Sequence, residues 1–268
     1  MSIIILGDLM NLSDLMIEAV DMKKDGVVRD VRKKKNVTIT KIDVSDSSIG
    51  EIGKYITVEF EDIMDKSIRK EVISLLKGLL EENGMKENSS ILVVGLGNER
   101  STPDSLGPLV IENIIVTRHL EVLGLNSKRV VSAIKPGVMG ETGIETKDII
   151  KGVVEKIKPD FLLVVDALKS GSLKRLNKTI QLTDTGIHPG SGVANKREKL
   201  DKKSLGIPVI AIGVPTVCDI RTIINESVDD NNIKNIPEMI ITPKEIDFII
   251  DKMSDLISIC INKALYEF

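Results

Sequence analysis

The chain has 268 residues, of which 42% are hydrophobic and 29% charged, a composition typical of a folded globular protein. Its net charge of −3, from 37 basic and 40 acidic residues, gives no general electrostatic reason to bind nucleic acid or an anionic membrane. Aromatic residues make up only 2%, which argues against base-stacking surfaces, and no apolar run is long enough to predict a membrane span.

Two further features bear on the compartment. The apolar run in "MSIIILGDLM" lacks a basic region before it, so we do not expect a secretory signal and expect a cytoplasmic protein. Cys218 and Cys260 lie too far apart for a zinc-site spacing, and we interpret both as buried apolar side chains in a reducing compartment.

The N-terminal third predicts two strands followed by a helix. Residues 28–45 and 54–62 alternate apolar and polar side chains, as half-buried strands do, and we expect them to form a small antiparallel pair. Apolar side chains recur at helical spacing in residues 64–82, and Gly84 ends that predicted helix.

The middle of the chain changes character. Four short apolar runs without alternation suit strands that are buried on both faces of a parallel sheet: 91–95, 129–134, 161–165 and 207–214. Residues 106–120 and 146–157 are predicted helices between them. The order of strands and helices therefore predicts an α/β fold, with a doubly wound, mostly parallel sheet flanked by helices.

The C-terminal part predicts one loop and one long helix. Residues 225–237 are interpreted as a flexible loop. Residues 242–267 form an amphipathic pattern, with Thr242 as the predicted N-cap and Glu245 completing a capping box.

The most informative stretch is "VVGLGNERSTPDSLGPLV", residues 93–110. A buried strand ends at Gly95 and Gly97, and "STPD" then opens a predicted helix with Asp104 in its first turn. The helix dipole would favour the ionised form of a carboxylate there. A dinucleotide-binding loop is excluded because Arg100 stands where its third glycine should be, whereas a tight strand-to-helix turn explains the glycines equally well.

A second carboxylate, Asp166, follows the apolar run 161–165. In open α/β sheets, ligands and catalytic groups gather at the carboxyl ends of the parallel strands. Asp166 could instead cap the next segment, and Asp104 has the same ambiguity. Taken together, however, the two carboxylates follow buried strands and could face each other across one cleft.

Two adjacent carboxyl groups can hydrolyse an amide without a metal. One stays ionised and takes a proton from water, while the other stays protonated and polarises the carbonyl, because close like charges oppose joint ionisation. On the dipole argument, Asp104 is the base and Asp166 is the desolvated acid.

Asp184, Thr185 and Gly186 spell the triplet that carries the catalytic carboxylate of pepsin-like and retroviral proteases. Those proteases are all-β and bring two copies together, whereas this α/β sequence has one copy, so we interpret it as a coincidence and Asp184 as a possible turn anchor. The glycine-rich loop that follows contains His188 and Ser191, and it could hold a substrate backbone or serve only as a long turn.

Several long motifs carry a family resemblance: "LVVGLGN", "TPDSLGPLVIENIIVTRHL", "PDFLLVVDAL", "DTGIHPGSGVANKR" and "LGIPVIAIGVPTVCD". From about residue 13 to its C-terminus, the chain closely resembles the germination proteases of spore-forming bacteria. The resemblance implies an aspartic-type endopeptidase without metal or cofactor that degrades small acid-soluble spore proteins in the spore core. It also implies a homotetramer and a fold related to the hydrogenase maturation endopeptidases.

The resemblance extends to particular residues. The two essential aspartates of the family match Asp104 in "TPDSLGP" and Asp166 in "VVDAL". We expect Asn98, His188, Gly190 and Ser191 to contact the substrate.

The family is made as an inactive precursor that removes its own N-terminal segment. The resemblance places this cut at Asp14–Leu15, which leaves residues 1–14 as a propeptide and residues 15–268 as a single peptidase domain. Residues 220–240 look shorter than is usual in the family. This shortening keeps a non-catalytic binding protein on the same scaffold open as an alternative. A metal-guided maturation protease is a second alternative.

Overall fold

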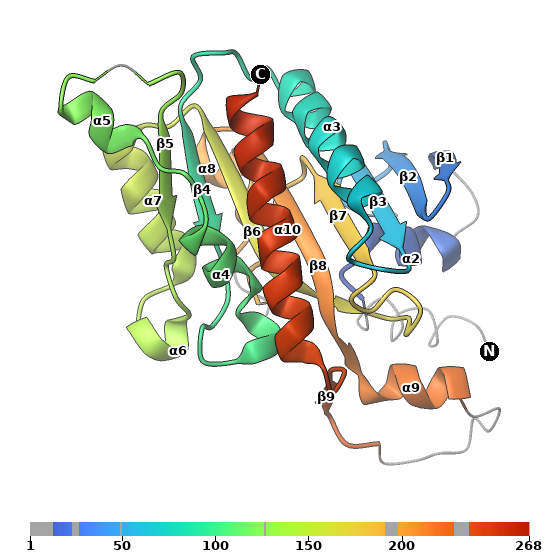
Figure 1. Cartoon of the computed structure of the whole chain (residues 1–268). Helices are drawn as coiled ribbons and strands as arrows, with labels where there is room; N and C mark the ends of the chain where they lie inside the picture. The colour runs from blue at the N-terminus through green and yellow to red at the C-terminus, as the bar shows by residue number, and fades with distance from the viewer. Residues whose placement is uncertain are drawn as a thin grey trace.

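The computed structural model describes residues 13–22, 27–48, 50–125, 127–190, 198–227 and 236–267. In this part of the chain, nine strands form one sheet in the order β1-β2-β3-β7-β8-β6-β4-β5, with β9 beside β8 (Figure 1). The strands are β1 (Val28–Lys34), β2 (Val37–Val44), β3 (Gly53–Phe60), β4 (Ile91–Gly95), β5 (Val131–Ile134), β6 (Phe161–Ser170), β7 (Thr179–Thr183), β8 (Val209–Asp219) and β9 (Ile240–Ile241).

The sheet has a parallel half and an antiparallel half. Strands β5, β4, β6 and β8 pair in parallel, while β7, β3, β2 and β1 continue the sheet with antiparallel pairing. The prediction of a mostly parallel sheet is therefore wrong, although the α/β class is confirmed. The expected small antiparallel element is not separate, because β7 joins it to β8. Sequence analysis missed β7 because Thr179, Gln181 and Thr183 are polar, yet all three are buried.

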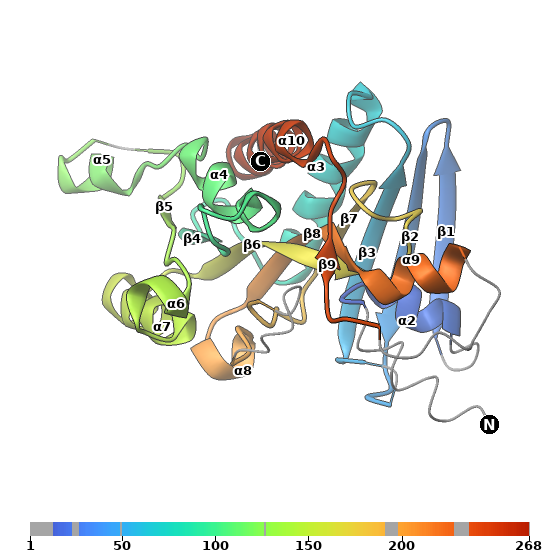
Figure 2. The same ribbon diagram turned by 90° about the horizontal axis from the view of Figure 1, so that it is seen from below.

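Helices cover both faces of the sheet (Figure 2). Helices α3, α4 and α10 pack on one face, and α2, α7 and α8 pack on the other, each group over its own apolar cluster. The helices are α2 (Met16–Met22), α3 (Lys66–Glu82), α4 (Leu106–Glu112), α5 (Arg118–Val122), α6 (Met139–Thr142), α7 (Thr146–Ile157), α8 (Lys202–Leu205), α9 (Ile220–Ser227) and α10 (Ile246–Tyr266), with the 3₁₀ turn η1 (Thr102–Asp104).

Helices α3 and α7 confirm the predictions made from helical spacing. The carboxylate of Asp65 caps α3 by accepting a hydrogen bond from the Ser67 N–H. Five side chains of α3 are buried, and each contributes roughly 1.5–3 kcal/mol when fully removed from water: Ile68, Val72, Leu76, Leu79 and Leu80.

The predicted helix over 106–120 is wrong, because it is two helices with a break between α4 and α5. In the break, the Ile115 N–H donates to Asn262 Oδ1 (3.0 Å), and the Thr117 N–H donates to the Val131 carbonyl (2.9 Å). The β-branched residues there have low helix propensity, and their backbone instead docks on α10 and on the edge of β5.

The capping box predicted for the last helix is also wrong. The Thr242 hydroxyl donates to the Thr216 carbonyl (2.8 Å) on β8, and α10 begins four residues later, at Ile246. Of the predicted loop 225–237, the first residues belong to α9, and 228–235 lie outside the described residues.

Strand β1 forms one edge of the sheet, and all seven of its residues are exposed. Five of them are charged: Arg29, Asp30, Arg32, Lys33 and Lys34.

Both cysteines are free and buried, as predicted. None of the described helices is long and apolar enough to cross a membrane.

Candidate active site

Two glycines bring α4 against the end of β4. A Cβ atom on Gly95 would lie 2.2 Å from the Gly107 carbonyl oxygen, and a Cβ atom on Gly107 would lie 2.2 Å from the Leu96 carbonyl oxygen. Neither position has room for a side chain, so this close approach of strand and helix depends on both glycines. The contact fixes where the loop between them, which carries Asp104, can lie.

The loop folds back on itself around Asp104. Gly97 has φ of +114° and no room for a side chain, because a Cβ atom there would lie 2.0 Å from the Asp104 carbonyl oxygen. The Asn98 N–H points at Asp104 and lies 2.9 Å from its Oδ2 and 3.0 Å from its carbonyl oxygen. The side chain of Asp104 is thereby held over the end of β4.

The pKa of Asp104 shifts in the direction opposite to the one that the helix dipole predicted. Burial raises the pKa of Asp104 to about 6, and the hydrogen bond from the Asn98 N–H acts in the opposite direction. Asp104 lies in η1, ahead of Ser105 at the N-cap of α4, and not in the first turn of an α-helix. Loss of hydration therefore outweighs the expected effect of the helix dipole on the pKa, although a carboxyl with a pKa of about 6 is still ionised at neutral pH.

Asp166 lies inside β6, and not after it as predicted. The strand continues to Ser170, and Asp166 pairs with Gly213 of β8, so Asp166 does not cap a following segment. The side chain is 1% exposed. Its Oδ1 accepts a hydrogen bond from the Ala167 N–H (3.0 Å), while its Oδ2 has no hydrogen-bond partner among the described residues.

The two carboxyl groups affect each other's ionisation. Burial raises the pKa of Asp166 well above its usual range, and the charges of Asp104 and Asp14 raise it further. The N–H groups of Ala167 and Gly190 act in the opposite direction. Because Asp104 and Asp166 interact, they titrate as a coupled pair.

The predicted substrate-contacting residues fall on two sides of this pair. Asn98 adjoins Asp104, and its Oδ1 accepts a hydrogen bond from the Arg100 N–H (2.8 Å). Gly190, with φ of +70°, lies close enough to Asp166 for its N–H to lower the pKa of that carboxyl. His188 is half-buried in the same loop, and Ser191 lies outside the described residues.

A third segment, residues 13–15, approaches Asp166 from the N-terminus. The Asp14 N–H donates to the Lys169 carbonyl (2.9 Å), and the Lys169 N–H donates to Asp14 Oδ2 (2.8 Å). Lys169 is three positions after Asp166 on β6. Leu15 is 2% exposed and packs in the apolar cluster under α2. The predicted cleavage position is thus bound along the strand that carries one carboxylate.

Polar contacts anchor α2 beside this segment. Glu18 is 3% exposed and accepts hydrogen bonds from the Ser170 hydroxyl (2.8 Å) and the Gly171 N–H (2.6 Å). Arg175 joins Asp21 of α2 (2.6 Å) to Glu59 of β3 (3.0 Å). None of these residues belongs to a sequence motif, although a glutamate within the apolar face of a short helix is a detectable signal.

Comparison with known sequences gives the same family as the motifs. The family model described as germination protease matches residues 8–236. The chain belongs to the germination protease family. It is 47% identical over 240 residues to the germination proteases of Bacillus cytotoxicus and Bacillus mycoides, and 46% identical over 241 residues to that of Bacillus anthracis.

These matches cover 81% of this chain but only 65% or 66% of each relative. The chain therefore spans slightly less than two thirds of the length of the germination proteases it matches. Both candidate aspartates and residues 13–15 lie within the region matched by the germination protease model.

Asp184 has a structural role in this member of the germination protease family. Its Oδ1 accepts a hydrogen bond from the Lys54 N–H (2.8 Å), and its Oδ2 accepts one from Asn83 Nδ2 (3.3 Å). The carboxylate therefore ties the end of β7 to the start of β3 and to the C-terminal end of α3. These contacts agree with the interpretation that the Asp-Thr-Gly triplet is a coincidence. However, Asp184 connects β7, β3 and α3, whereas we expected it to stabilise only a local turn.

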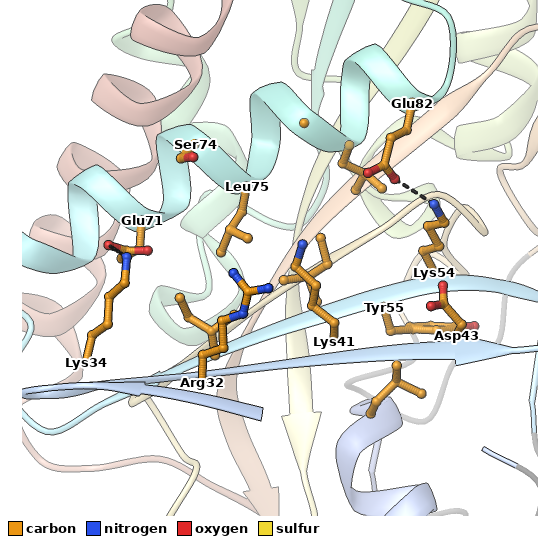
Figure 3. A pocket seen from close by; sticks show the side chains of 15 residues that line it. Arg32, Lys34, Lys41, Asp43, Lys54, Tyr55, Glu71, Ser74, Leu75 and Glu82 are labelled. Carbon is orange, nitrogen blue, oxygen red and sulfur yellow. Dashed lines mark hydrogen bonds and ion pairs between the residues drawn. The ribbon is translucent and has the colours of Figure 1, made fainter. Parts of the chain in front are cut away.

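A groove of about 360 Å³ lies between α3 and strands β1 to β3 (Figure 3). Basic side chains from the strands face acidic ones from the helix, with Lys34 paired to Glu71 (2.8 Å) and Lys54 paired to Glu82 (2.7 Å). Neither candidate aspartate lines this groove. In the described residues, no three His, Cys, Asp or Glu side chains gather as metal ligands would.

Proposed function

We propose that this chain is an endopeptidase that hydrolyses small acid-soluble spore proteins in the spore core during germination. The observation that carries the proposal is the coupled pair of carboxyl groups, with Asp104 partly buried beyond the end of β4 and Asp166 fully buried in the neighbouring parallel strand β6. Membership of the germination protease family supports both the activity and the substrate class.

The two carboxyl groups take different parts in the reaction. With a pKa of about 6, Asp104 is ionised at neutral pH and accepts a proton from the attacking water. Asp166 stays protonated, and its Oδ2, which has no hydrogen-bond partner among the described residues, donates a hydrogen bond to the substrate carbonyl oxygen. The water oxygen then bonds to the carbonyl carbon. Asp104 passes its proton to the leaving nitrogen as the C–N bond breaks.

The proposal includes a precursor with residues 1–14 as its propeptide. Asp14 is held along β6, its charge raises the pKa of Asp166, and Leu15 supplies the apolar side chain after the cut. Residues 1–12 lie outside the described residues. A chain that begins at Leu15 is expected to cut substrate faster than the full chain, and Asp166→Asn in the full chain should prevent trimming. Equal activity of both lengths would exclude an inhibitory propeptide.

The proposal also includes what the family resemblance implies about domain structure, assembly and ligands. These implications are a single domain over residues 15–268, a homotetramer, no cofactor, and no direct contact with nucleic acid or membrane. The proposed kinship with the hydrogenase maturation endopeptidases rests on the Gly-x-Gly-Asn loop before Asp104. Light scattering of the purified chain measures the oligomer directly.

The decisive experiment is incubation of the purified chain with a small acid-soluble spore protein, followed by mass analysis of the fragments. Fragments should appear with the parent chain, with or without a chelator, and should be absent with Asp166→Asn. Binding without cleavage by the trimmed chain would favour a non-catalytic binding protein. Loss of cleavage on chelation, restored by added metal, would favour a metal-guided maturation protease.

A further inference from the structure

Gln181 lies in the middle of β7 on the same face of the sheet as Asp166. Gln181 pairs with Gly213 of β8, which in turn pairs with Asp166 of β6, and side chains of directly paired residues share a face. Gly213 carries no side chain, and Leu168 packs over it. Gln181 is 5% exposed, and the residues from Asp14 to α2 cover it.

The primary amide of Gln181 holds two peptide groups of the covering segment. Its Nε2 donates to the Asp14 carbonyl oxygen (3.3 Å), and its Oε1 accepts from the Met16 N–H (2.8 Å). One hydrogen bond lies on each side of Leu15, so the side chain of Gln181 binds this backbone in the way that the backbone of a neighbouring strand would. The carbonyl that Gln181 contacts belongs to the peptide bond between Asp14 and Leu15, which is the bond proposed to be cut.

The other groups of Asp14 are held as well. Its N–H and its carboxylate bond the backbone of Lys169, so the amide, the side chain and the carbonyl are all fixed. Leu15 is buried among apolar side chains. Residues 14–16 therefore lie as a bound peptide would, with an acidic residue before the bond and an apolar residue after it.

The sheet face that carries Gln181 also carries two buried polar side chains, where apolar side chains would pack equally well. Thr57 of β3 pairs with Gln181, and Thr40 of β2 pairs with Thr57, so the three side chains form a row on one face. Both threonine hydroxyls are buried and have no hydrogen-bond partner among the described residues. Buried polar groups without partners are uncommon, and a row of them beside a bound segment indicates a surface suited to peptide groups.

We propose that Gln181 is a substrate-binding residue that positions the scissile peptide, both in self-processing and in the cleavage of other proteins. The proposal rests on the proposed peptidase function. The ligand is an extended peptide with an acidic residue followed by an apolar one. The amide of Gln181 binds the carbonyl before the cut and the N–H one residue beyond it, while the Lys169 backbone binds the acidic residue.

The test uses Gln181→Glu and Gln181→Met in the full chain and in the chain that begins at Leu15. Ionised Glu keeps an acceptor for the Met16 N–H but loses the donor to the Asp14 carbonyl, and Met loses both. Self-trimming should slow at least about tenfold in both variants, the scale set by one lost hydrogen bond at a buried site. With the shorter chain, KM for a synthetic peptide of residues 9–20 should rise.

Acidification separates positioning from a merely structural role. Protonated Glu can donate to the carbonyl, so the activity of Gln181→Glu relative to the parent should recover as pH falls, while that of Gln181→Met should not. Thr179→Val is the matched control, because it changes a buried polar side chain on the same face of β7 whose hydroxyl has no hydrogen-bond partner among the described residues, and it should leave KM for the peptide unchanged.

Three outcomes are informative. Trimming and KM at parental values in both Gln181 variants would overturn the proposal, as would losses that follow only the unfolded fraction measured by circular dichroism. In both cases, continued cleavage by the parent chain would leave the proposed peptidase function intact. A parent chain that cuts neither the peptide nor a spore protein would instead overturn that function and the proposal with it.

Discussion

The two halves of the sheet differ in what they bury. In the parallel half, all residues of β4 and β6 are buried, and the only charged groups in the carboxyl-terminal region of β6 are Asp166 and Lys169. In the antiparallel half, one face buries a polar row, Thr40, Thr57 and Gln181, under the segment that leads into α2. Under the proposed function, both carboxyl groups belong to the parallel half, while the antiparallel half contributes the side chain of Gln181 to a segment that also bonds the β6 backbone at Lys169.

The largest expected effect comes from removing either carboxylate of the parallel half. Asp104→Asn and Asp166→Asn should each reduce turnover of a spore protein by at least about 10²-fold, the scale of general acid–base catalysis. Circular dichroism should show an unchanged fold. Near-normal turnover by either folded variant would show that the substituted aspartate is not catalytic.

A methyl group at the strand-to-helix contact should cost most in stability. In Gly107→Ala, the new Cβ would meet the Leu96 carbonyl oxygen at 2.2 Å and the Val165 carbonyl oxygen at 2.7 Å, so α4 must move away from β4. We expect a loss of about 3 kcal/mol in the free energy of unfolding, measured by urea titration. Activity should fall as well, because the Asp104 loop shifts with α4.

The matched control for Gly107→Ala is Gly152→Ala in α7. A Cβ atom there meets nothing within 4 Å, and alanine favours a helix interior, so stability should rise by up to about 1 kcal/mol. Equal effects of the two substitutions would mean that the close contact at Gly107 does not limit the packing.

The partly buried carboxyl of Asp104 predicts a dependence of stability on pH. Its pKa is about 6 in the folded protein and 3.8 in its ordinary state, so the folded protein holds the proton more tightly. The stabilising contribution is complete below about pH 4 and is lost as pH rises through about 6. Asp104→Asn should therefore be more stable than the parent at pH 8, by on the order of 2 kcal/mol, but not at pH 4.

Ionisation of Asp104 should also control turnover, but turnover should rise with pH where stability falls. Because the proposed base is the ionised form of Asp104, activity should rise as pH increases through about 6, and it should fall again where Asp166 ionises. Urea unfolding and initial rates over pH 4–9 check both statements. A pH-independent stability difference between parent and Asp104→Asn would contradict the buried carboxyl.

The smallest effect is expected at Asp184, in the antiparallel half. In Asp184→Asn, the amide oxygen can still accept the Lys54 N–H, so stability should fall by about 1 kcal/mol or less and most activity should remain. Complete loss of turnover in a folded variant would restore the Asp-Thr-Gly triplet as a catalytic element.

The sequence predicted the parallel half well, because its signals are local. Apolar runs predicted β4, β6 and β8, although β6 and β8 each continue five residues beyond the predicted end, and helical spacing predicted α3 and α7 at or near their observed bounds. Family motifs selected Asp104 and Asp166, and strand-end reasoning selected the same two residues independently.

In the antiparallel half, strand β7 is formed through contacts with segments distant in sequence, which the local pattern of apolar and polar residues does not reveal. Strand β7 buries Thr179, Gln181 and Thr183 under another segment, so its polarity suggested a loop. Two features of the parallel half were missed for the same reason. The break before α5 depends on Asn262, far along the chain. The pKa of Asp104 likewise depends on how much of the fold covers it, which the dipole argument did not include.

The charged edge strand β1 has a consequence for self-association. Its outer side is unpaired by any described strand, and an open strand edge can recruit the edge of another molecule and begin a fibre. Two β-branched side chains, Val28 and Val31, would favour such growth, but Arg29, Arg32 and Lys33 would bring like charges together in every added copy. The basic residues of this strand thus oppose the addition of further strands at this edge of the sheet.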